Sequence, residues 1–522
     1  MKILFYYRGS EQLGVEALSA LLKREGHEVG LLYDPGADNV FYFELPIFKR
    51  LNVEDRLVKQ AIEFQPDLIA FSCITNLYPY EKSIASRLKQ HLPVPFVIGG
   101  VHPSTVPDKI IEDELFDYLC IGEGDYALLD LVNAIEKGGD TTTIQNIQAV
   151  VDGKVYKNDT RPLVQDLDQL PIPDKSLFYD RGAFYRSLLI MTSRGCPFKC
   201  SFCVNNFYHE IKKPHEKPVR QKSVPFSIRE IQSCLHYGKP QTISILDDVF
   251  GVNHGWLEEF AAVYPKKIGL PFLCNVYPSV VTKEHASLLK KSGCATALMG
   301  IQSGSPEVRS RMQRRETNEQ IEQACQYLRE EGITVQAEFI FGYPNETSDQ
   351  MWESVQLSQR IKSKGVRSGT FVFYPFPKTE AQAQADAANL IDESQWKNIT
   401  EGQGSYHVKI MMNQPYINEA LNLASLVPIF DKLPPLFTQK ILRRVYKWKN
   451  GSHFRAAGIM GLLLFGNPWL LRERIQNLSY MLLRIFTRPM FLKSSSEQKM
   501  NQGSRVYTDE RSISNCTSDE VP

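Results

Sequence analysis

The stretch Leu188-Leu-Ile-Met-Thr-Ser-Arg-Gly-Cys196-Pro-Phe-Lys-Cys200-Ser-Phe-Cys203-Val-Asn-Asn206 decides how the rest of this 522-residue chain is interpreted. An apolar run typical of a β-strand ends in Arg194-Gly195, and three cysteines follow with three and then two residues between them. Three thiolates on one short loop can hold three irons of a [4Fe–4S] cluster, whose usual protein complement is four cysteines. The fourth iron then stays open to a small molecule. We therefore predict that Cys196, Cys200 and Cys203 bind an open [4Fe–4S] cluster.

The three cysteines have two alternative interpretations: a zinc knuckle that lacks its fourth ligand, and a chance grouping of buried thiols. Structural zinc sites are closed by four ligands, often as two separated pairs. No second Cys or His pair at a suitable spacing follows closely in the sequence. The open cluster is therefore favoured.

The cysteine motif, with the aromatic Phe202 directly before its last cysteine, resembles the radical S-adenosylmethionine (SAM) family. The region before the motif resembles a cobalamin-binding domain, so the chain is similar to the B12-binding radical SAM proteins. The resemblance covers roughly the first four-fifths of the chain. It implies an α/β fold with a Rossmann-like domain, a partial (β/α)6 TIM-type barrel and a C-terminal helical region.

Composition and charge are those of a globular protein with no nucleic-acid partner. Lys+Arg 60 against Asp+Glu 59 gives a net charge of +1, so no strong field points to nucleic acid or anionic membrane. Ten cysteines in a chain of this length are not a disulfide framework. A reducing cytoplasm is the expected compartment.

Residues 1–150 alternate apolar runs with helical patterns, which predicts a parallel sheet. In such a sheet ligands bind at the carboxyl ends of the strands. Loops with glycine fall there, although Gly-Gly after a strand is commonly just a turn. Together they resemble the B12 domain, which implies cobalamin contacts from Gly14, Ser72, Thr75, Gly99, Gly100, His102, Gly122, Glu123 and Gly124.

One departure from the B12 pattern concerns the cobalt. Many B12 domains carry Asp-x-His-x-x-Gly after the first strand, but the loop from Arg8 to Gly14 has no histidine. We therefore expect no histidine below the cobalt, and for His102 a surface or capping role is favoured over axial ligation. Loss of cobalamin binding altogether is the alternative.

After a hairpin turn at Asp152-Gly153, residues 151–184 are predicted to be a proline-stiffened linker and residues 185–400 a barrel. Six apolar runs predict the barrel strands, and the cysteine motif follows the first. Chemistry in such barrels lies at the carboxyl ends of the strands. The predicted strands cover 188–192, 242–246, 272–276, 296–301, 335–341 and 369–373.

Polar or glycine-containing ends of later strands are the candidate SAM contacts. Asp247 and Asp248 end the second barrel strand and are predicted to bind the amino group or ribose of SAM, with helix capping as the alternative. The remaining SAM contacts implied by the resemblance are Phe202, Gln302, Ser303, Phe341 and Gly342. Three arginines could position the carboxylate of SAM, but they are expected instead to be charged surface residues of a helix: Arg311, Arg314 and Arg315.

The resemblance implies an enzyme that splits SAM with one electron into methionine and a 5′-deoxyadenosyl radical. With cobalamin, methylation of an unactivated carbon is the leading reaction. The alternatives are a cobalamin-independent cyclase or rearrangement enzyme and a non-catalytic iron–sulfur redox protein. Ferredoxin or flavodoxin is the expected electron donor, and the sequence assigns neither a catalytic residue nor a substrate.

The chain after about residue 400 loses the α/β pattern. Residues 401–492 are predicted to form a helical cap over the substrate. The alternative is a basic helix on a membrane surface, which would suit a lipid-like substrate. Residues 493–522 are polar and are predicted to be disordered.

Overall fold

The computed structural model describes residues 1–36, 53–183, 187–363, 365–403, 411–430, 440 and 442–447. Its first sheet has seven strands in the order β2-β1-β3-β4-β5-β6-β7, of which the first five are parallel. Because β1 lies between β2 and β3, the loops that follow β1 and β3 diverge at a topological switch point. The strands are β1 (Lys2–Arg8), β2 (Glu28–Asp34), β3 (Leu68–Ser72), β4 (Phe96–Gly99), β5 (Tyr118–Cys120), β6 (Ile147–Val151) and β7 (Lys154–Tyr156).

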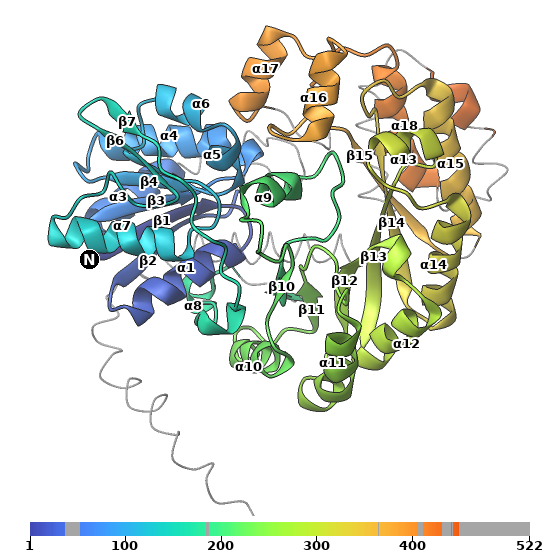
Figure 1. Cartoon of the computed structure of the whole chain (residues 1–522), viewed down its shortest axis with the longest axis horizontal. Coiled ribbons are helices and arrows are strands. Elements are labelled where there is room, and N and C mark those ends of the chain that lie inside the picture. Colours follow the sequence, from blue (N-terminus) through green and yellow to red (C-terminus); the bar gives the residue numbers. More distant parts are fainter. Residues whose placement is uncertain are drawn as a thin grey trace, which may run out of the picture.

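Helices cover both faces of this sheet, as the near-continuous apolar strands require (Figure 1). One face is buried under α1 (Leu13–Arg24), α7 (Asp125–Lys137) and the short α8 (Ser176–Tyr179). The other face is buried under α3 (Val53–Phe64), α4 (Tyr78–Lys89) and α6 (Pro107–Glu112). The predicted hairpin joins β6 to β7, with positive φ at Asp152 and Gly153.

The second sheet is the predicted six-stranded parallel one, with its strands in sequence order from β8 to β15. Helices α10 to α15 pack on its outer face around one apolar core. Every predicted barrel strand is present to within two residues. The strands are β8 (Ser187–Ile190), β11 (Thr242–Ile245), β12 (Phe272–Val276), β13 (Cys294–Gln302), β14 (Thr334–Phe341) and β15 (Arg367–Val372). The helices are α10 (Val224–Cys234), α11 (His254–Lys267), α12 (Lys283–Ser292), α13 (Pro306–Arg311), α14 (Asn318–Glu330) and α15 (Ser348–Lys362).

Segments beyond the two sheets join the halves. Helix α9 (Asn205–Ile211) follows the cysteine loop, and the short strands β9 (Ser193–Arg194) and β10 (Arg220–Gln221) pair beside it. Figure 1 places α16 (Glu380–Ala387) and α17 (Glu393–Thr400) at one end, between the halves. The Ala381 amide at the start of α16 donates to the Ser201 carbonyl in the cysteine loop at 2.9 Å.

Helix α18 (Ile417–Phe430) packs on β15 and belongs to the predicted C-terminal helical region. Most of the region after it, including the predicted membrane-surface helix and the polar tail, lies outside the described residues. Among the helices that the structure describes, none is both long and apolar enough to cross a membrane.

Candidate active site

A cavity of about 470 Å³ lies where the carboxyl ends of the two sets of strands face each other. Phe5 and Leu128 line it from the first sheet's domain, and Leu189 and Leu246 line it from the barrel. Both the volume and the mainly apolar walls are typical of small-molecule and cofactor sites. The cavity therefore brings the predicted corrin-binding loops and the cysteine loop to one place.

The cysteine loop forms one wall, and its three cysteines gather with Phe198 and Tyr277 in a small cluster. All three cysteines are free thiols, and Cys196 lines the cavity. Burial, reinforced by nearby acidic groups, raises the pKa of Cys196 to about 12 and that of Cys203 to about 11. Iron must therefore displace protons from these thiols when it binds.

The two aspartates after β11 have different surroundings. The Asp247 carboxylate is fully buried and accepts four hydrogen bonds of 2.5–3.2 Å from the amides and hydroxyls of Thr192 and Ser193. It joins the ends of two strands and does not line the cavity. Asp248 lines the cavity beside Cys196 and Asn205. Its side chain is open to the cavity, and partial desolvation by the surrounding protein atoms raises its pKa. Of the two, Asp248 is placed to meet a ligand.

The two SAM contacts predicted at the end of β13 also have different surroundings. Gln302 follows a bulge, has φ +71° and is half-buried. Ser303 is fully buried and turned toward α15, where its hydroxyl lies 3.2 Å from that of Ser354.

Beyond β13, the predicted contacts are mostly embedded in the barrel. Phe341 is buried in the barrel core, whereas Phe202 is half-buried in the cysteine cluster. The Gly342 amide donates to the Glu346 carboxylate at 2.7 Å. These SAM assignments remain predictions, with Asp248 the one that lines the cavity.

Seven of the nine predicted cobalamin contacts line the cavity. Gly14 faces open space, because a Cβ there would meet no atom within 4 Å. Gly100 has φ +102°, and a Cβ there would lie 2.5 Å from the Cys73 carbonyl oxygen, so only glycine fits without strain. The seven are Gly14, Ser72, Gly99, Gly100, Gly122, Glu123 and Gly124.

The other two, Thr75 and His102, are buried away from the cavity. The Nδ1 atom of His102 lies 3.3 Å from the Thr75 hydroxyl, and its ring packs on Tyr78. Burial lowers the pKa of His102 to about 4, so the imidazole is neutral. His102 therefore packs into the protein interior and supports the conformation of the loop after β4.

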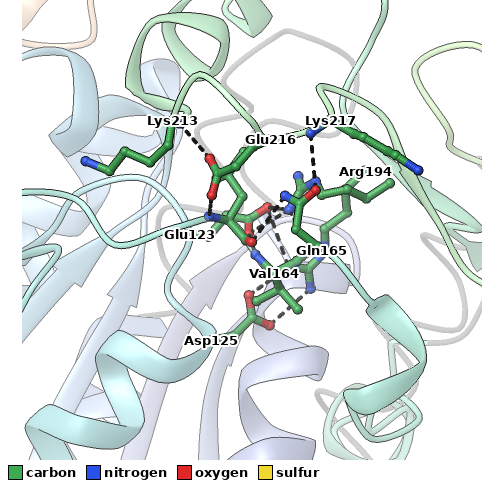
Figure 2. Close-up of polar contacts among 10 residues, drawn as sticks. Glu123, Asp125, Val164, Gln165, Arg194, Lys213, Glu216 and Lys217 are labelled. Carbon is green, nitrogen blue, oxygen red and sulfur yellow. Dashed lines mark hydrogen bonds and ion pairs between the residues drawn. The ribbon is translucent and has the colours of Figure 1, made fainter.

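A network of ion pairs and hydrogen bonds joins the loop after β5 to the cysteine loop (Figure 2). Both terminal nitrogens of Arg194 donate to the Asp125 carboxylate, at 2.7 and 3.0 Å. Arg220 pairs with Glu123 at 2.8 Å. Burial alone would raise the pKa of Asp125, but the Arg194 guanidinium outweighs it and holds that pKa below its usual range. The network fixes the two cofactor loops relative to each other.

Comparison with known proteins identifies the family. The sequence model of the B12 binding domain matches residues 9–132, and that of the Radical SAM superfamily matches residues 190–358. The chain is a B12-binding radical SAM enzyme. Its cofactors are a [4Fe–4S] cluster, SAM and cobalamin. The predicted family and fold class are confirmed.

Relatives of this radical SAM enzyme are distant. An uncharacterized methyltransferase, PH0819 of Pyrococcus horikoshii, is 26% identical over 400 residues, which are 74% of this chain and 81% of the relative. The anaerobic magnesium-protoporphyrin IX monomethyl ester cyclase of Rubrivivax gelatinosus is 23% identical over 66% of this chain and 63% of its own length.

Two solved structures share the fold. TsrM from Kitasatospora setae, solved with cobalamin and a [4Fe–4S] cluster bound, has a TM-score of 0.58 at 20% identity and covers 74% of this chain and 75% of its own. OxsB, solved with aqua-cobalamin and SAM bound, has a TM-score of 0.60 at 17% identity over 93% of this chain and 79% of its own.

The residues of this radical SAM enzyme fit the cofactors. Three free thiols on one loop suit a cluster, and glycine backbones that face the cavity suit a close-lying corrin. Among the described residues, no three His, Cys, Asp or Glu side chains converge on one metal ion.

Two residues near the site of this radical SAM enzyme belong to no recognisable sequence motif. Arg314 was expected at the surface with Arg311 and Arg315, but its side chain is buried beside Cys200. Glu338 lies on the face of β14 opposite the buried Ala337 and Phe339, and so points into the barrel, where burial raises its pKa. Glu338 could have been found in the sequence, because it is a charged residue within the otherwise mostly apolar run of β14.

Proposed function

We propose that this enzyme transfers a methyl group to an unactivated carbon of a small-molecule substrate. The observation that supports this most is the shared cavity, lined both by the glycine loops of the B12 domain and by Cys196 and Asp248 of the barrel. A corrin and cluster-bound SAM would therefore face each other across one space. Relatives named as methyltransferases support the same reaction class.

Each part of the cavity has a task in this proposal. Cys196, Cys200 and Cys203 hold the cluster, and the Asp248 carboxylate accepts hydrogen bonds from the SAM amino group. When bound, the cofactors supply a 5′-deoxyadenosyl radical and a methyl group carried on cobalt. The apolar side chains of Leu189 and Leu246 keep water from the space between them.

Partners follow from this chemistry. Reduction of the cluster requires an external electron donor, for which we propose a ferredoxin or flavodoxin. A lipid-like substrate and peripheral membrane contact would involve residues 401–492, most of which lie outside the described residues. Nine described cysteines are free thiols, which supports a reducing cytoplasm as the working compartment.

The test is an anaerobic incubation of the reconstituted enzyme with hydroxocobalamin, dithionite and SAM that carries a deuterated methyl group. We expect 5′-deoxyadenosine together with deuterated methylcobalamin. Formation of 5′-deoxyadenosine with no corrin bound would support a cobalamin-independent cyclase or rearrangement enzyme instead. A fully loaded cluster that yields neither product would support a redox protein.

Asp248→Asn and Asp247→Asn form a matched pair for the same assay. We expect Asp248→Asn to lose SAM cleavage while it keeps the cluster and the stability of the wild type. Asp247→Asn should instead lose stability, because the amide nitrogen that replaces one carboxylate oxygen cannot accept the two hydrogen bonds that this oxygen accepts in the wild type. Equal SAM cleavage by Asp248→Asn and the wild type would contradict the assigned role.

A further inference from the structure

Arg314 brings a buried positive charge to the cysteine loop. Its side chain is only 4% exposed, and its Nη1 atom lies 3.5 Å from the Sγ atom of Cys200. Its other terminal nitrogen, Nη2, donates to the Gly300 carbonyl at 2.6 Å. Because a guanidinium stays charged at any pH that proteins tolerate, this site carries a permanent positive charge next to a cluster ligand.

The guanidinium is held rigidly in this position. It lies 4.1 Å from the centre of the Tyr277 ring, which in turn stacks on Phe198 of the cysteine loop at 3.6 Å. The carboxylate of Glu316 lies 3.7 Å from Nη2, while Nη1 faces the sulfur. The ion pair of Arg314 and Glu316 therefore directs its positively charged end toward Cys200.

Neighbouring arginines do not share this environment. Arg311 is partly exposed and pairs with Glu307 at 3.2 Å. Arg315 is exposed, although it directly follows Arg314 in the sequence. Solvent and salt screen an exposed charge far more than a buried one. Among these three arginines, Arg314 is therefore the one that can influence the cluster strongly.

We infer that Arg314 raises the reduction potential of the cluster through its contact with Cys200. One-electron reduction adds a negative charge that spreads onto the ligand sulfurs. A fixed N–H donor and positive charge beside one of them stabilise the reduced cluster more than the oxidised one. The inference rests on the proposed function, because it requires Cys200 to bind an iron. It makes Arg314 a residue that acts through a ligand and sets how readily an electron donor reduces the enzyme.

The experiment is an anaerobic redox titration of the reconstituted full-length enzyme, followed by the electron paramagnetic resonance signal of the reduced cluster, without SAM. In Arg314→Gln we expect the ratio of reduced to oxidised cluster at a fixed potential to fall roughly tenfold. For a one-electron couple this equals a midpoint lower by about 59 mV. Arg315→Gln, which removes the same charge one residue away, should titrate like the wild type.

Arg314→Lys is measured as well, in case Arg314→Gln cannot hold the cluster. Lysine keeps the charge but cannot bond the sulfur and the Gly300 carbonyl together, so we expect a smaller fall in the same direction. A wild-type midpoint in Arg314→Gln, or in Arg314→Lys if the first variant binds no iron, would overturn the inference. Absence of iron and sulfide from the wild-type enzyme would overturn the proposed function instead.

Discussion

The substitution Asp125→Asn tests how the two cofactor loops are held together. Asp125 opens α7 directly after the Gly122-Glu-Gly loop, and Arg194 directly precedes the Gly195-Cys196 pair. The two side chains make a bidentate ion pair across the junction of the halves. Asparagine has nearly the same shape but lacks the charge, so the guanidinium loses its principal partner.

The expected cost can be worked out from the burial of the pair. Removing one partner of a buried ion pair costs about 3–5 kcal/mol, since the remaining charge is left uncompensated. Here the Arg194 side chain is 23% exposed, and the Glu123 carboxylate lies 3.8 Å from its Nη1 atom. Both features reduce the free-energy cost of losing the Asp125 charge. We therefore expect the free energy of unfolding to fall by about 3 kcal/mol, the low end of that range.

The assay is urea-induced unfolding of Asp125→Asn, Arg194→Gln and the double variant, followed by far-UV circular dichroism. In a double-mutant cycle, two residues that interact directly should show a coupling energy of about 1–3 kcal/mol. Additive effects of the two substitutions would refute the claim that this ion pair holds the loops. Asp108→Asn is the matched control, because its ion pair with Lys157 is exposed and should contribute less than about 1 kcal/mol.

Three further predictions concern backbone conformation, strand joining and pH. Gly100→Ala should lower the free energy of unfolding by about 1–3 kcal/mol and weaken cobalamin binding, because the φ of Gly100 is +102°. Gly14→Ala is the control: its added Cβ meets no atom within 4 Å, so its free energy of unfolding should lie within about 0.5 kcal/mol of the wild-type value. Asp247→Asn should lower the free energy of unfolding by about 2–4 kcal/mol, whereas Asp248→Asn should leave it unchanged in the same urea titration. Burial raises the pKa of Glu81 to about 8, so the folded protein keeps a proton that the unfolded chain releases near its ordinary pKa of 4.5. Stability should therefore fall by about 1.4 kcal/mol per pH unit between those two values relative to Glu81→Gln, and equal pH profiles would contradict this.

The framework of both domains could be predicted from the sequence because local patterns determine it. The parallel strands are short apolar runs, and most of them are followed by a turn and a helical pattern. The cysteine motif is likewise local, since all its members lie within eight residues from Cys196 to Cys203. The positive φ values at Asp152 and Gly153 show the same principle in the predicted hairpin.

The direction in which individual side chains point could not be predicted so well. Asp247 and Asp248 are adjacent at a strand end, and the sequence does not show which of them turns into the cavity. On β13 a register shift between Gly300 and Gln302 changes which face the next residues occupy, and it turns Ser303 toward α15.

Contacts between distant parts of the chain are also beyond local patterns. Arg194 meets Asp125 from 69 residues away, and Arg314 meets Cys200 from 114 residues away. Nothing near Arg314 in the sequence distinguishes it from its exposed neighbour Arg315. Such residues become visible only when the fold brings the segments together.

The central claim is that Cys196, Cys200 and Cys203 hold a cluster that cleaves SAM. Its most direct test is the yield of 5′-deoxyadenosine, measured by mass spectrometry, after the anaerobically reconstituted enzyme is mixed with dithionite and SAM. We predict that the wild type forms 5′-deoxyadenosine and that Cys200→Ala loses both the thiolate–iron absorbance and the product. A wild-type enzyme with a full cluster that forms no 5′-deoxyadenosine would contradict the claim, as would a Cys200→Ala variant that still forms it.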